Sequence, residues 1–264
     1  MGIVNVTPDS FSDGGLYLEP DAAVAHGTRL VEEGAAMLDV GGESTRPGAA
    51  PVEEAEELGR VLPVLERLAE RVDARLSIDT TKLGVARGAI AAGASVVNDV
   101  SAFRFSPELA GLVADAGADC VLMHMLGEPR TMQEDPRYDD VVSDVRAFLE
   151  ERLAFAVAEG VPEEQVWLDP GIGFGKTVEH NLELLDRLDE IVAIGQPVVV
   201  GTSRKSFLGK LTGRSERDRL GGTIATNVLA FERGASVFRV HDVAPVSDAL
   251  QVAAATVRQR EPSA

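Results

Sequence analysis

Short apolar runs recur along the chain, and most of them end in a polar or charged residue. Residues 76–78 run into Asp79, residues 96–97 into Asn98, and residues 166–168 into Asp169. A strand that is buried on both faces of a sheet requires such continuous apolarity. The polar residues that follow therefore indicate strand ends that open onto one shared site. The predicted strands span residues 2–6, 37–40, 75–79, 95–99, 119–124, 166–169, 197–201 and 236–240.

Patterns typical of helices separate these strands, and four of the helices end in the same Gly-Ala pair, at Gly34, Gly93, Gly117 and Gly234. Glycine at such a position supplies the left-handed residue that closes a helix. Eight βα units in 264 residues predict an α/β fold, a single (β/α)8 TIM barrel over residues 1–264 with its active site at the C-terminal ends of the strands. A doubly wound open sheet is the alternative, but such sheets usually have fewer strands.

Composition excludes several classes of partner. The net charge is −18, and no basic run is longer than the pair at residues 204–205. Such an acidic field repels nucleic acid and anionic membranes, so we expect neither as a partner. No apolar stretch approaches the roughly 20 residues of a membrane span, and the first ten residues do not resemble a signal peptide. Because the single cysteine, Cys120, also excludes an intrachain disulfide framework, we expect a cytoplasmic protein.

Metal-binding patterns are weak in this sequence. Glu53, Glu54, Glu56 and Glu57 stand close together, but we interpret them as the start of a solvated helix whose N-terminal dipole favours acidic side chains. The four histidines show no HExxH or similar spacing, so a zinc site is not expected.

Two segments, residues 5–15 and 41–49, show neither a helix nor a strand pattern. Both are rich in turn formers and both follow predicted barrel strands. Each contains a residue that a plain connector would not need, Phe11 in the first and Arg46 in the second. We therefore interpret them as lids over the predicted site.

The segment at residues 169–177 is rich in glycine and invites comparison with nucleotide-binding loops. A Walker A loop would need glycine at position 170, where Pro170 has no N–H to give to a phosphate. The glycines at 171, 173 and 175 also miss the GxGxxG spacing. We interpret this segment as a backbone that approaches a flat ligand, with Phe174 beside the ligand and the Asp169 carboxylate at its edge.

Eight strings carry a family resemblance across nearly the whole chain. In order they are GIVNVTPDSFSDGG, DVGGESTRPGA, SIDTTK, VVNDVS, LMHM, LDPGIGFGK, GTSRKSFLG and FRVHDV. As an ordered set they closely resemble the dihydropteroate synthase family. The resemblance implies a TIM barrel that condenses 6-hydroxymethyl-7,8-dihydropterin diphosphate with p-aminobenzoate, giving 7,8-dihydropteroate and diphosphate in folate synthesis. It also implies a Mg²⁺ cofactor, a homodimer and inhibition by sulfonamides.

The resemblance assigns one group of residues to the pterin. Asp169 matches the pterin-binding aspartate, and its carboxylate can accept hydrogen bonds from both the amino group and the ring N–H along one edge of the heterocycle. The resemblance implies five further contacts: Asn98 and Lys205 on the other polar ring atoms, Met123 and Phe174 as pocket walls, and Asp79 near the reacting methylene.

A second group is assigned to the diphosphate, the metal and p-aminobenzoate. The resemblance places Asn5 on Mg²⁺, which prefers oxygen ligands and keeps several waters, so that one amide and the substrate's own oxygens suffice. Around the phosphates it places Thr45, Arg46, Arg239 and His241. Around p-aminobenzoate it places Phe11, Thr45, Pro47 and Ser203, with Ser203 at a helix N-terminus that offers free N–H groups to the carboxylate.

The implied mechanism is a dissociative substitution. Diphosphate leaves first, a resonance-stabilised cation forms at the pterin methylene, and the arylamine nitrogen attacks. The residues implied as catalytic are Asn5, Arg46, Asp79 and Lys205. Four nearby polar residues stay outside the predicted site, as strand-end caps (Asp39 and Asp99), a ligand of loop amides (Glu43) or an outward-facing side chain (Arg204).

Two other functions remain open at this point. A pterin-binding methyltransferase domain shares the barrel and its Asp and Asn ligands, but has no use for the STRPGA and SRK strings found here. A catalytically silent pterin-binding paralogue is the second alternative, which intact Asn5, Asp79 and Lys205 disfavour. The apolar faces of the last two predicted helices are either a dimer interface or a surface that packs on the barrel.

Overall fold

The computed structural model describes residues 1–7, 20–45 and 48–258. Within these ranges the parallel strands follow the predicted order, with bounds that differ from the predicted ones by no more than a few residues. They are β1 (Gly2–Asn5), β2 (Met37–Gly41), β3 (Arg75–Asp79), β4 (Val96–Asp99), β5 (Asp119–Met123), β6 (Val166–Asp169), β7 (Val199–Val200) and β8 (Val237–Phe238).

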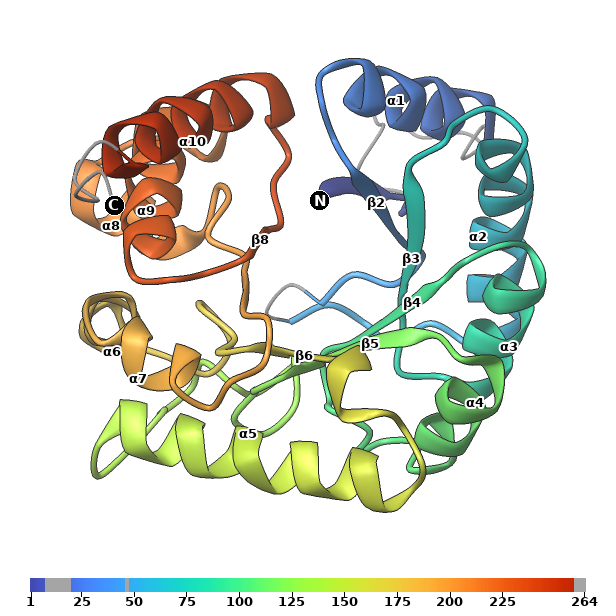
Figure 1. The fold of residues 1–264 in the computed structure, drawn as a ribbon, viewed down its shortest axis with the longest axis horizontal. Coiled ribbons are helices and arrows are strands. Elements are labelled where there is room, and N and C mark those ends of the chain that lie inside the picture. Colours follow the sequence, from blue (N-terminus) through green and yellow to red (C-terminus); the bar gives the residue numbers. More distant parts are fainter. Residues whose placement is uncertain (8–19, 46–47, 259–264) are drawn as a thin grey trace.

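Helices surround these strands (Figure 1). They are α1 (Pro20–Glu32), α2 (Glu54–Ala69), α3 (Leu83–Ala91), α4 (Glu108–Ala116), α5 (Val141–Ala158), α6 (Val178–Asp186), α7 (Leu188–Val192), α8 (Ser206–Thr212), α9 (Leu220–Glu232) and α10 (Val243–Arg258). The glycines of the four Gly-Ala pairs all have positive φ angles, from 61° at Gly117 to 105° at Gly93, which confirms their predicted role in ending helices. None of the helices in the described part of the chain combines the length and the apolarity that crossing a membrane requires.

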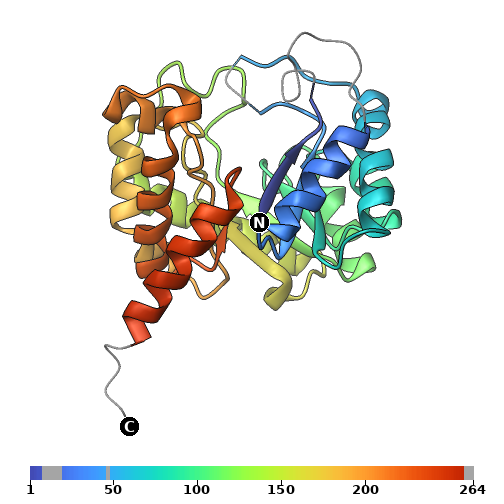
Figure 2. The same ribbon diagram turned by 90° about the horizontal axis from the view of Figure 1, so that it is seen from above.

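The barrel closes through two narrow seams. Strands β1 to β6 form one sheet and β7 pairs with β8 in a second. A single bridge between Leu168 and Val198 joins β6 to the second sheet, and a bridge between Gly2 and Val240 joins the second sheet to β1. The resulting ring confirms the predicted (β/α)8 barrel, and α8 to α10 lie on the opposite side from α1 to α3 (Figure 2).

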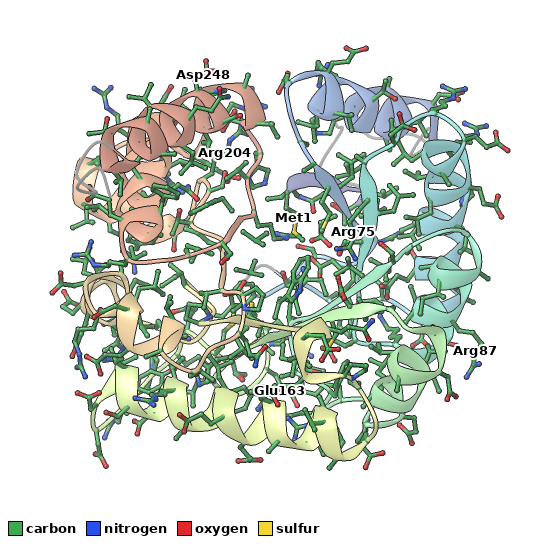
Figure 3. All side chains as sticks on the ribbon, viewed as in Figure 1. Met1, Arg75, Arg87, Glu163, Arg204 and Asp248 are labelled. Carbon is green, nitrogen blue, oxygen red and sulfur yellow. The ribbon has the colours of Figure 1, made fainter. Side chains whose placement is uncertain are left out.

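Side chains that point into the barrel change from apolar to polar along the strand direction. The lower layer is a cluster of buried apolar residues from β2, β4, β5 and β7: Met37, Val96, Val121 and Val199. Two residues further along β2 and β4 stand Asp39 and Asn98, both buried. Since neighbouring inward positions lie two residues apart on a strand, the apolar layer supports a polar layer above it. Arg75 of β3, labelled near the centre of the ring in Figure 3, is level with Met37 of β2 and pairs with Asp119.

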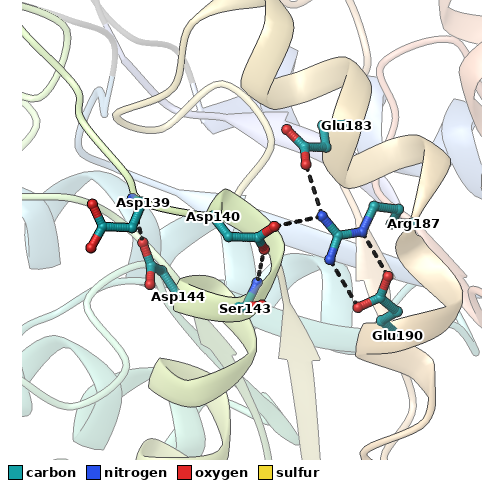
Figure 4. Close-up of polar contacts among 7 residues, drawn as sticks. All are labelled: Asp139, Asp140, Ser143, Asp144, Glu183, Arg187 and Glu190. Atoms are coloured by element: carbon teal, nitrogen blue, oxygen red, sulfur yellow. Dashed lines mark hydrogen bonds and ion pairs between the residues drawn. The ribbon is translucent and has the colours of Figure 1, made fainter.

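On the outside of the barrel, one arginine joins two helix ends (Figure 4). Arg187, between α6 and α7, contacts Glu183 and Asp140 at 2.8 Å and Glu190 at 2.6 Å. Asp140 also accepts a hydrogen bond from the backbone N–H of Ser143 and so caps α5. Exposed pairs of this kind add little to stability, so this network mainly fixes where the segment after β5 returns to the barrel wall.

Candidate active site

A cavity of about 420 Å³ opens at the C-terminal ends of the strands. It is lined by all the predicted site residues that the structure describes: Asn5, Thr45, Asp79, Asn98, Met123, Asp169, Phe174, Ser203, Lys205, Arg239 and His241. Phe11, Arg46 and Pro47 lie outside the described residues. The barrel therefore brings side chains from six strand ends and from the loops after β2, β6 and β7 into one space, while their individual roles remain predictions.

Strand register explains why these residues meet. Asn5 of β1 is level with Gly41 of β2, Gly41 with Asp79 of β3, and Asp79 with Asn98 of β4. On the far side, Met123 of β5 is level with Asp169 of β6. Because the strands are parallel, their last residues all face the same end of the barrel.

Asp169 is held at the cavity wall by the turn that follows it. Its Oδ1 atom accepts a hydrogen bond of 2.7 Å from the backbone N–H of Gly171. Gly171 has a φ of 67°, and a Cβ atom there would lie 1.8 Å from the carbonyl oxygen of His124, so only glycine fits. Burial raises the pKa of Asp169 above its usual value, although the Gly171 N–H and the charge of Lys205 oppose the shift. Hydrogen-bond donors on a ligand would favour the ionised carboxylate further.

An apolar wall and a cation stand beside this carboxylate. Met123 and Phe174 pack with Val100 and Met132 in one buried cluster, and Lys205 Nζ lies 4.0 Å from the centre of the Phe174 ring. A cation at this distance from an aromatic face is attracted by the ring. Burial lowers the pKa of Lys205 to about 8, so this side chain remains mostly charged at neutral pH.

Arg239 connects the two sheets of the barrel through a pair of aspartates. Its Nε atom lies 2.6 Å from Asp39 Oδ2, and its Nη2 atom lies 2.7 Å from Asp79 Oδ2. Burial raises the pKa of Asp79 to about 7, while Arg239 opposes this shift and Asp39 adds to it. Arg239 thus forms ion pairs with two carboxylates and also lines the cavity.

The interpretation of Asp39 as a strand-end cap is wrong, and it missed the contacts that this residue makes below the cavity. Its fully buried carboxylate accepts hydrogen bonds from Ser77 Oγ at 2.5 Å and from Asn98 Nδ2 at 3.0 Å, in addition to its contact with Arg239. The bond from Asn98 Nδ2 turns the amide oxygen of Asn98 away from Asp39. The sequence contained one indication of this burial: Asp39 stands two residues after Met37, so both side chains point to the same face of the strand.

Ser203 and His241 form a pair at another part of the cavity wall. Ser203 Oγ lies 3.0 Å from His241 Nδ1 and accepts a hydrogen bond of 3.1 Å from the His241 backbone N–H. Burial lowers the pKa of His241 to about 3, so its imidazole is neutral at pH 7. The helix N-terminus predicted at Ser203 is displaced, because α8 begins at Ser206, which also lines the cavity.

Arg204 lines the cavity, although the sequence favoured an outward orientation for it. Its φ of 57° is unusual for a non-glycine residue, and it lies between Ser203 and Lys205. The guanidinium of Arg204 pairs with Asp242 at 2.5 Å. The backbone carbonyl of Arg204 accepts a hydrogen bond from the guanidinium of Arg219. Arg219 is a second cavity-lining cation that sequence reasoning missed, and no sequence motif marked it.

Of the other polar residues left out of the site, Asp99 behaves as predicted, whereas Glu43 bonds a loop amide as predicted but also lines the cavity and pairs with Lys82. Asp99 accepts hydrogen bonds from the backbone N–H groups of Ser101 and Phe103, at 2.7 and 2.8 Å. Glu43 accepts a bond of 2.8 Å from the backbone N–H of Val52, across the loop after β2. Asp99 therefore shapes the turn after β4, and Glu43 closes the base of the loop that carries Thr45.

The interpretation of residues 53–57 as a solvated acidic cluster is wrong for Glu57. Its side chain is fully buried, and Lys82 Nζ lies 2.5 Å from Glu57 Oε2 and 2.7 Å from Glu43 Oε2. The other carboxylate oxygen of Glu57 has no hydrogen-bond partner among the described residues. Lys82 therefore links α2 to the loop that carries Thr45.

Replacing Lys82 with methionine is expected to lower the free energy of unfolding by about 2 kcal/mol, because the buried Glu57 carboxylate would lose its charged partner. Urea denaturation followed by circular dichroism measures the change. Arg87→Met on the outer surface of α3 (Figure 3) is the matched control, because it removes an exposed charge from the adjacent helix. A loss no larger than that of the control would contradict this role of Lys82.

The described side chains provide few ligands for a metal ion. The described residues contain no group of three or more His, Cys, Asp or Glu side chains that could hold one. The half-buried amide of Asn5 reaches the cavity. One amide oxygen fits a Mg²⁺ ion that takes its remaining ligands from a diphosphate and from water.

The fold and the cavity define a (β/α)8 enzyme whose site combines carboxylates, cations and an apolar wall. A model of the pterin-binding enzyme family matches residues 1–241. This match covers most of the chain and includes every described residue of the candidate site.

Individual relatives give a finer assignment. Dihydropteroate synthase of Escherichia coli (strain K12) is 45% identical over 261 residues, which is 99% of this chain and 92% of the relative. A Yersinia pestis dihydropteroate synthase in complex with a sulfonamide drug superposes with a TM-score of 0.93 at 43% identity, covering 98% of this chain and 93% of the other. The Xanthomonas albilineans enzyme with 4-aminobenzoic acid gives a TM-score of 0.91 at 50% identity, covering 99% and 93%; it has also been solved with 7,8-dihydropteroate. The chain belongs to the dihydropteroate synthases, within the pterin-binding enzyme family.

Proposed function

We propose that this protein is a transferase that condenses 6-hydroxymethyl-7,8-dihydropterin diphosphate with p-aminobenzoate to give 7,8-dihydropteroate and diphosphate. The observation that carries the proposal is the buried Asp169 carboxylate, which stands at the cavity wall beside Phe174 and Lys205. This arrangement suits a flat heterocycle with donors along one edge and an acceptor elsewhere. The Xanthomonas relative, solved with 4-aminobenzoic acid and with 7,8-dihydropteroate, supports the same pair of substrate and product.

The diphosphate is expected to face the cations at the cavity mouth. Arg239 and Lys205 are buried charges that stabilise a departing anion without reorganisation, and His241 contributes a neutral hydrogen-bonding group. Asn5 would hold Mg²⁺, which when bound neutralises charge on the diphosphate oxygens. Thr45 and Arg46 would complete the contacts from the loop after β2.

Bond breaking then precedes bond making in this proposal. The C–O bond to diphosphate breaks, its electron pair leaves with the diphosphate, and the ionised Asp79 carboxylate stabilises the cation at the pterin methylene. The amine nitrogen of p-aminobenzoate attacks this carbon with its lone pair, and the resulting N–H⁺ group loses one proton to water or to the departing diphosphate. Phe11, Thr45, Pro47 and Ser203 would surround the arylamine and exclude water, as closing loops do in other enzymes.

The test of this function is a direct assay. Purified protein is incubated with the pterin diphosphate, labelled p-aminobenzoate and Mg²⁺, and the products are separated by chromatography. Labelled dihydropteroate is the expected product. Its absence in correctly folded protein that still binds the pterin would favour a silent paralogue, and methyl transfer from a folate would favour the methyltransferase alternative.

Turnover is expected to fall as the pH drops from about 8 to about 6, because the raised pKa of Asp79, about 7, lies in this range. Only the ionised carboxylate stabilises the cation, so protonation below the pKa removes it from the reaction. Steady-state kcat across this range is the measurement. Asp79→Asn should lower kcat by about a hundredfold or more and flatten this acid limb; an unchanged limb in the variant would assign it to another group.

Assembly and location follow as further parts of the proposal. Exposed apolar side chains gather on α8 to α10: Leu211, Leu220, Leu229 and Val252. Val246 of α10 is instead 2% exposed and packs in the main core. We propose a homodimer through the exposed part of this face and a cytoplasmic location, and light scattering on a sizing column measures the dimer mass.

A further inference from the structure

Lys176 is a buried cation that the proposed chemistry does not use. Its side chain is 3% exposed, and Nζ donates a hydrogen bond of 3.0 Å to the carbonyl oxygen of Phe174 and lies 2.8 Å from Nδ1 of His124. No carboxylate forms an ion pair with it among the described residues. Burial without an adjacent carboxylate disfavours the charged form of this amine, and a titratable group that is perturbed in this way next to a cavity is a candidate for a functional residue.

The contact between Lys176 and His124 joins the end of β5 to the turn after β6, the two segments that carry the apolar walls of the cavity. His124 follows Met123 at the end of β5, and Lys176 follows the turn that carries Phe174 after β6. A backbone hydrogen bond joins the same two segments: the His124 N–H donates a bond of 2.9 Å to the Asp169 carbonyl. A shift of Lys176 would therefore move both apolar walls relative to Asp169.

His124 is built to accept the ammonium group. Its ring packs edge-on against Phe148, with centroids 4.8 Å apart. Burial lowers the pKa of His124 to about 2, so the imidazole is neutral and Nδ1 can accept a hydrogen bond from Lys176. His124 is thus a packed residue directly after β5 whose hydrogen-bond partner is Lys176.

Lys176 also acts on Asp169 through charge. Its ammonium group is one of the positive charges that favour the ionised form of the Asp169 carboxylate, together with Lys205 and Arg239. Lys205 and Arg239 line the cavity, whereas Lys176 stands behind the wall. A ligand can thus bind Asp169 without displacing Lys176. Burial lowers the pKa of Lys176 to about 7, so its positive charge is partial at neutral pH and grows as the pH falls.

We propose that Lys176 and His124 are a positioning pair for the pterin substrate: together they hold the end of β5, with Met123, against the turn that carries Phe174, and the protonated form of Lys176 places a positive charge behind Asp169. The proposal rests on the proposed function, because it assumes that the heterocycle binds at Asp169. It predicts a defect confined to the pterin, since the residues assigned to p-aminobenzoate lie in other loops.

The experiment compares Lys176→Met, which keeps the length of the side chain and removes the charge, with Lys210→Met on the exposed surface of α8. Calorimetry with the pterin diphosphate and Mg²⁺ gives Kd, and steady-state assays give KM for each substrate. Lys176→Met should weaken pterin binding and raise its KM at least about tenfold, with the KM of p-aminobenzoate within about twofold of wild type. Lys210→Met should match wild type throughout.

A second pair of variants separates position from folding. Asparagine places its Oδ1 near the position of His124 Nδ1, so His124→Asn should keep pterin affinity within about threefold, whereas His124→Leu should reproduce the loss seen in Lys176→Met. Pterin affinity within twofold of wild type in folded Lys176→Met, or equal losses in both His124 variants, would overturn the proposal. If Lys176→Met fails to fold, the His124 pair decides. A wild-type protein that makes no dihydropteroate would instead contradict the proposed function.

Discussion

Replacing Asp169 with alanine is expected to abolish measurable binding of the pterin diphosphate. The variant would lose two charge-assisted hydrogen bonds to the edge of the heterocycle, at about 2 kcal/mol each. A total of about 4 kcal/mol corresponds to roughly a thousandfold weaker binding. Isothermal titration calorimetry with the pterin diphosphate and Mg²⁺ measures this loss directly.

Two further variants make the Asp169 result specific. Asp169→Asn keeps the size of the side chain and one acceptor but presents an NH2 group to a ring N–H, so its affinity should also fall steeply. Asp115→Ala removes an exposed carboxylate from α4 and should bind like wild type. Binding of Asp169→Ala within tenfold of wild type would place the pterin elsewhere and would remove the basis of the proposed function.

Replacing Arg239 with methionine is expected to damage stability and catalysis together. It would leave two carboxylates, Asp39 and Asp79, without their shared cation, and Asp39 is fully buried. Removing one partner of a buried ion pair typically costs about 3–5 kcal/mol. Chemical denaturation measures this change in the free energy of unfolding. Turnover should fall by about a hundredfold or more, because a preorganised positive charge near the departing diphosphate is lost.

The Arg239 prediction has a matched control and a compensating variant. Arg233 pairs with Asp186 at 2.7 Å on the surface, and Arg233→Met should change stability by less than about 1 kcal/mol. Adding Asp39→Asn to Arg239→Met removes one unpaired charge and should restore part of the lost stability without restoring turnover. A double variant no more stable than Arg239→Met would show that the charge on Asp39 is not the cause.

The alternation of strands and helices was predictable because it depends on local chemistry. Continuous apolar runs require burial on both faces of a sheet, and the Gly-Ala pairs mark helix ends whose φ angles are positive, as at Gly34 and Gly93. Strand ends were less certain at β7 and β8, which keep only two residues each in regular pairing. Seam geometry depends on contacts between segments far apart in the sequence, which a local pattern does not contain.

The residues at strand ends were predictable for the same reason, since a polar side chain directly after a buried apolar run indicates the point where the strand leaves the core. The partners of these residues were not predictable. Asp39 resembles a strand-end cap in sequence, and only the barrel brings it to Asn98 and Arg239, the latter 200 positions away. Glu57 shares the sequence context of its solvated neighbours, and its burial depends on Lys82 in another βα unit. Such pairings are set by tertiary packing.

The narrow seams give Arg239 an additional role. The six-stranded sheet carries Asp39, Asp79 and Asp169, whereas β8, in the smaller sheet, leads into Arg239. Its two ion pairs therefore connect the smaller sheet to the larger one. They lie next to a seam in which a single bridge joins the two sheets. A mutation of this side chain would therefore weaken the closure of the barrel as well as change the site, so position 239 has little freedom to vary.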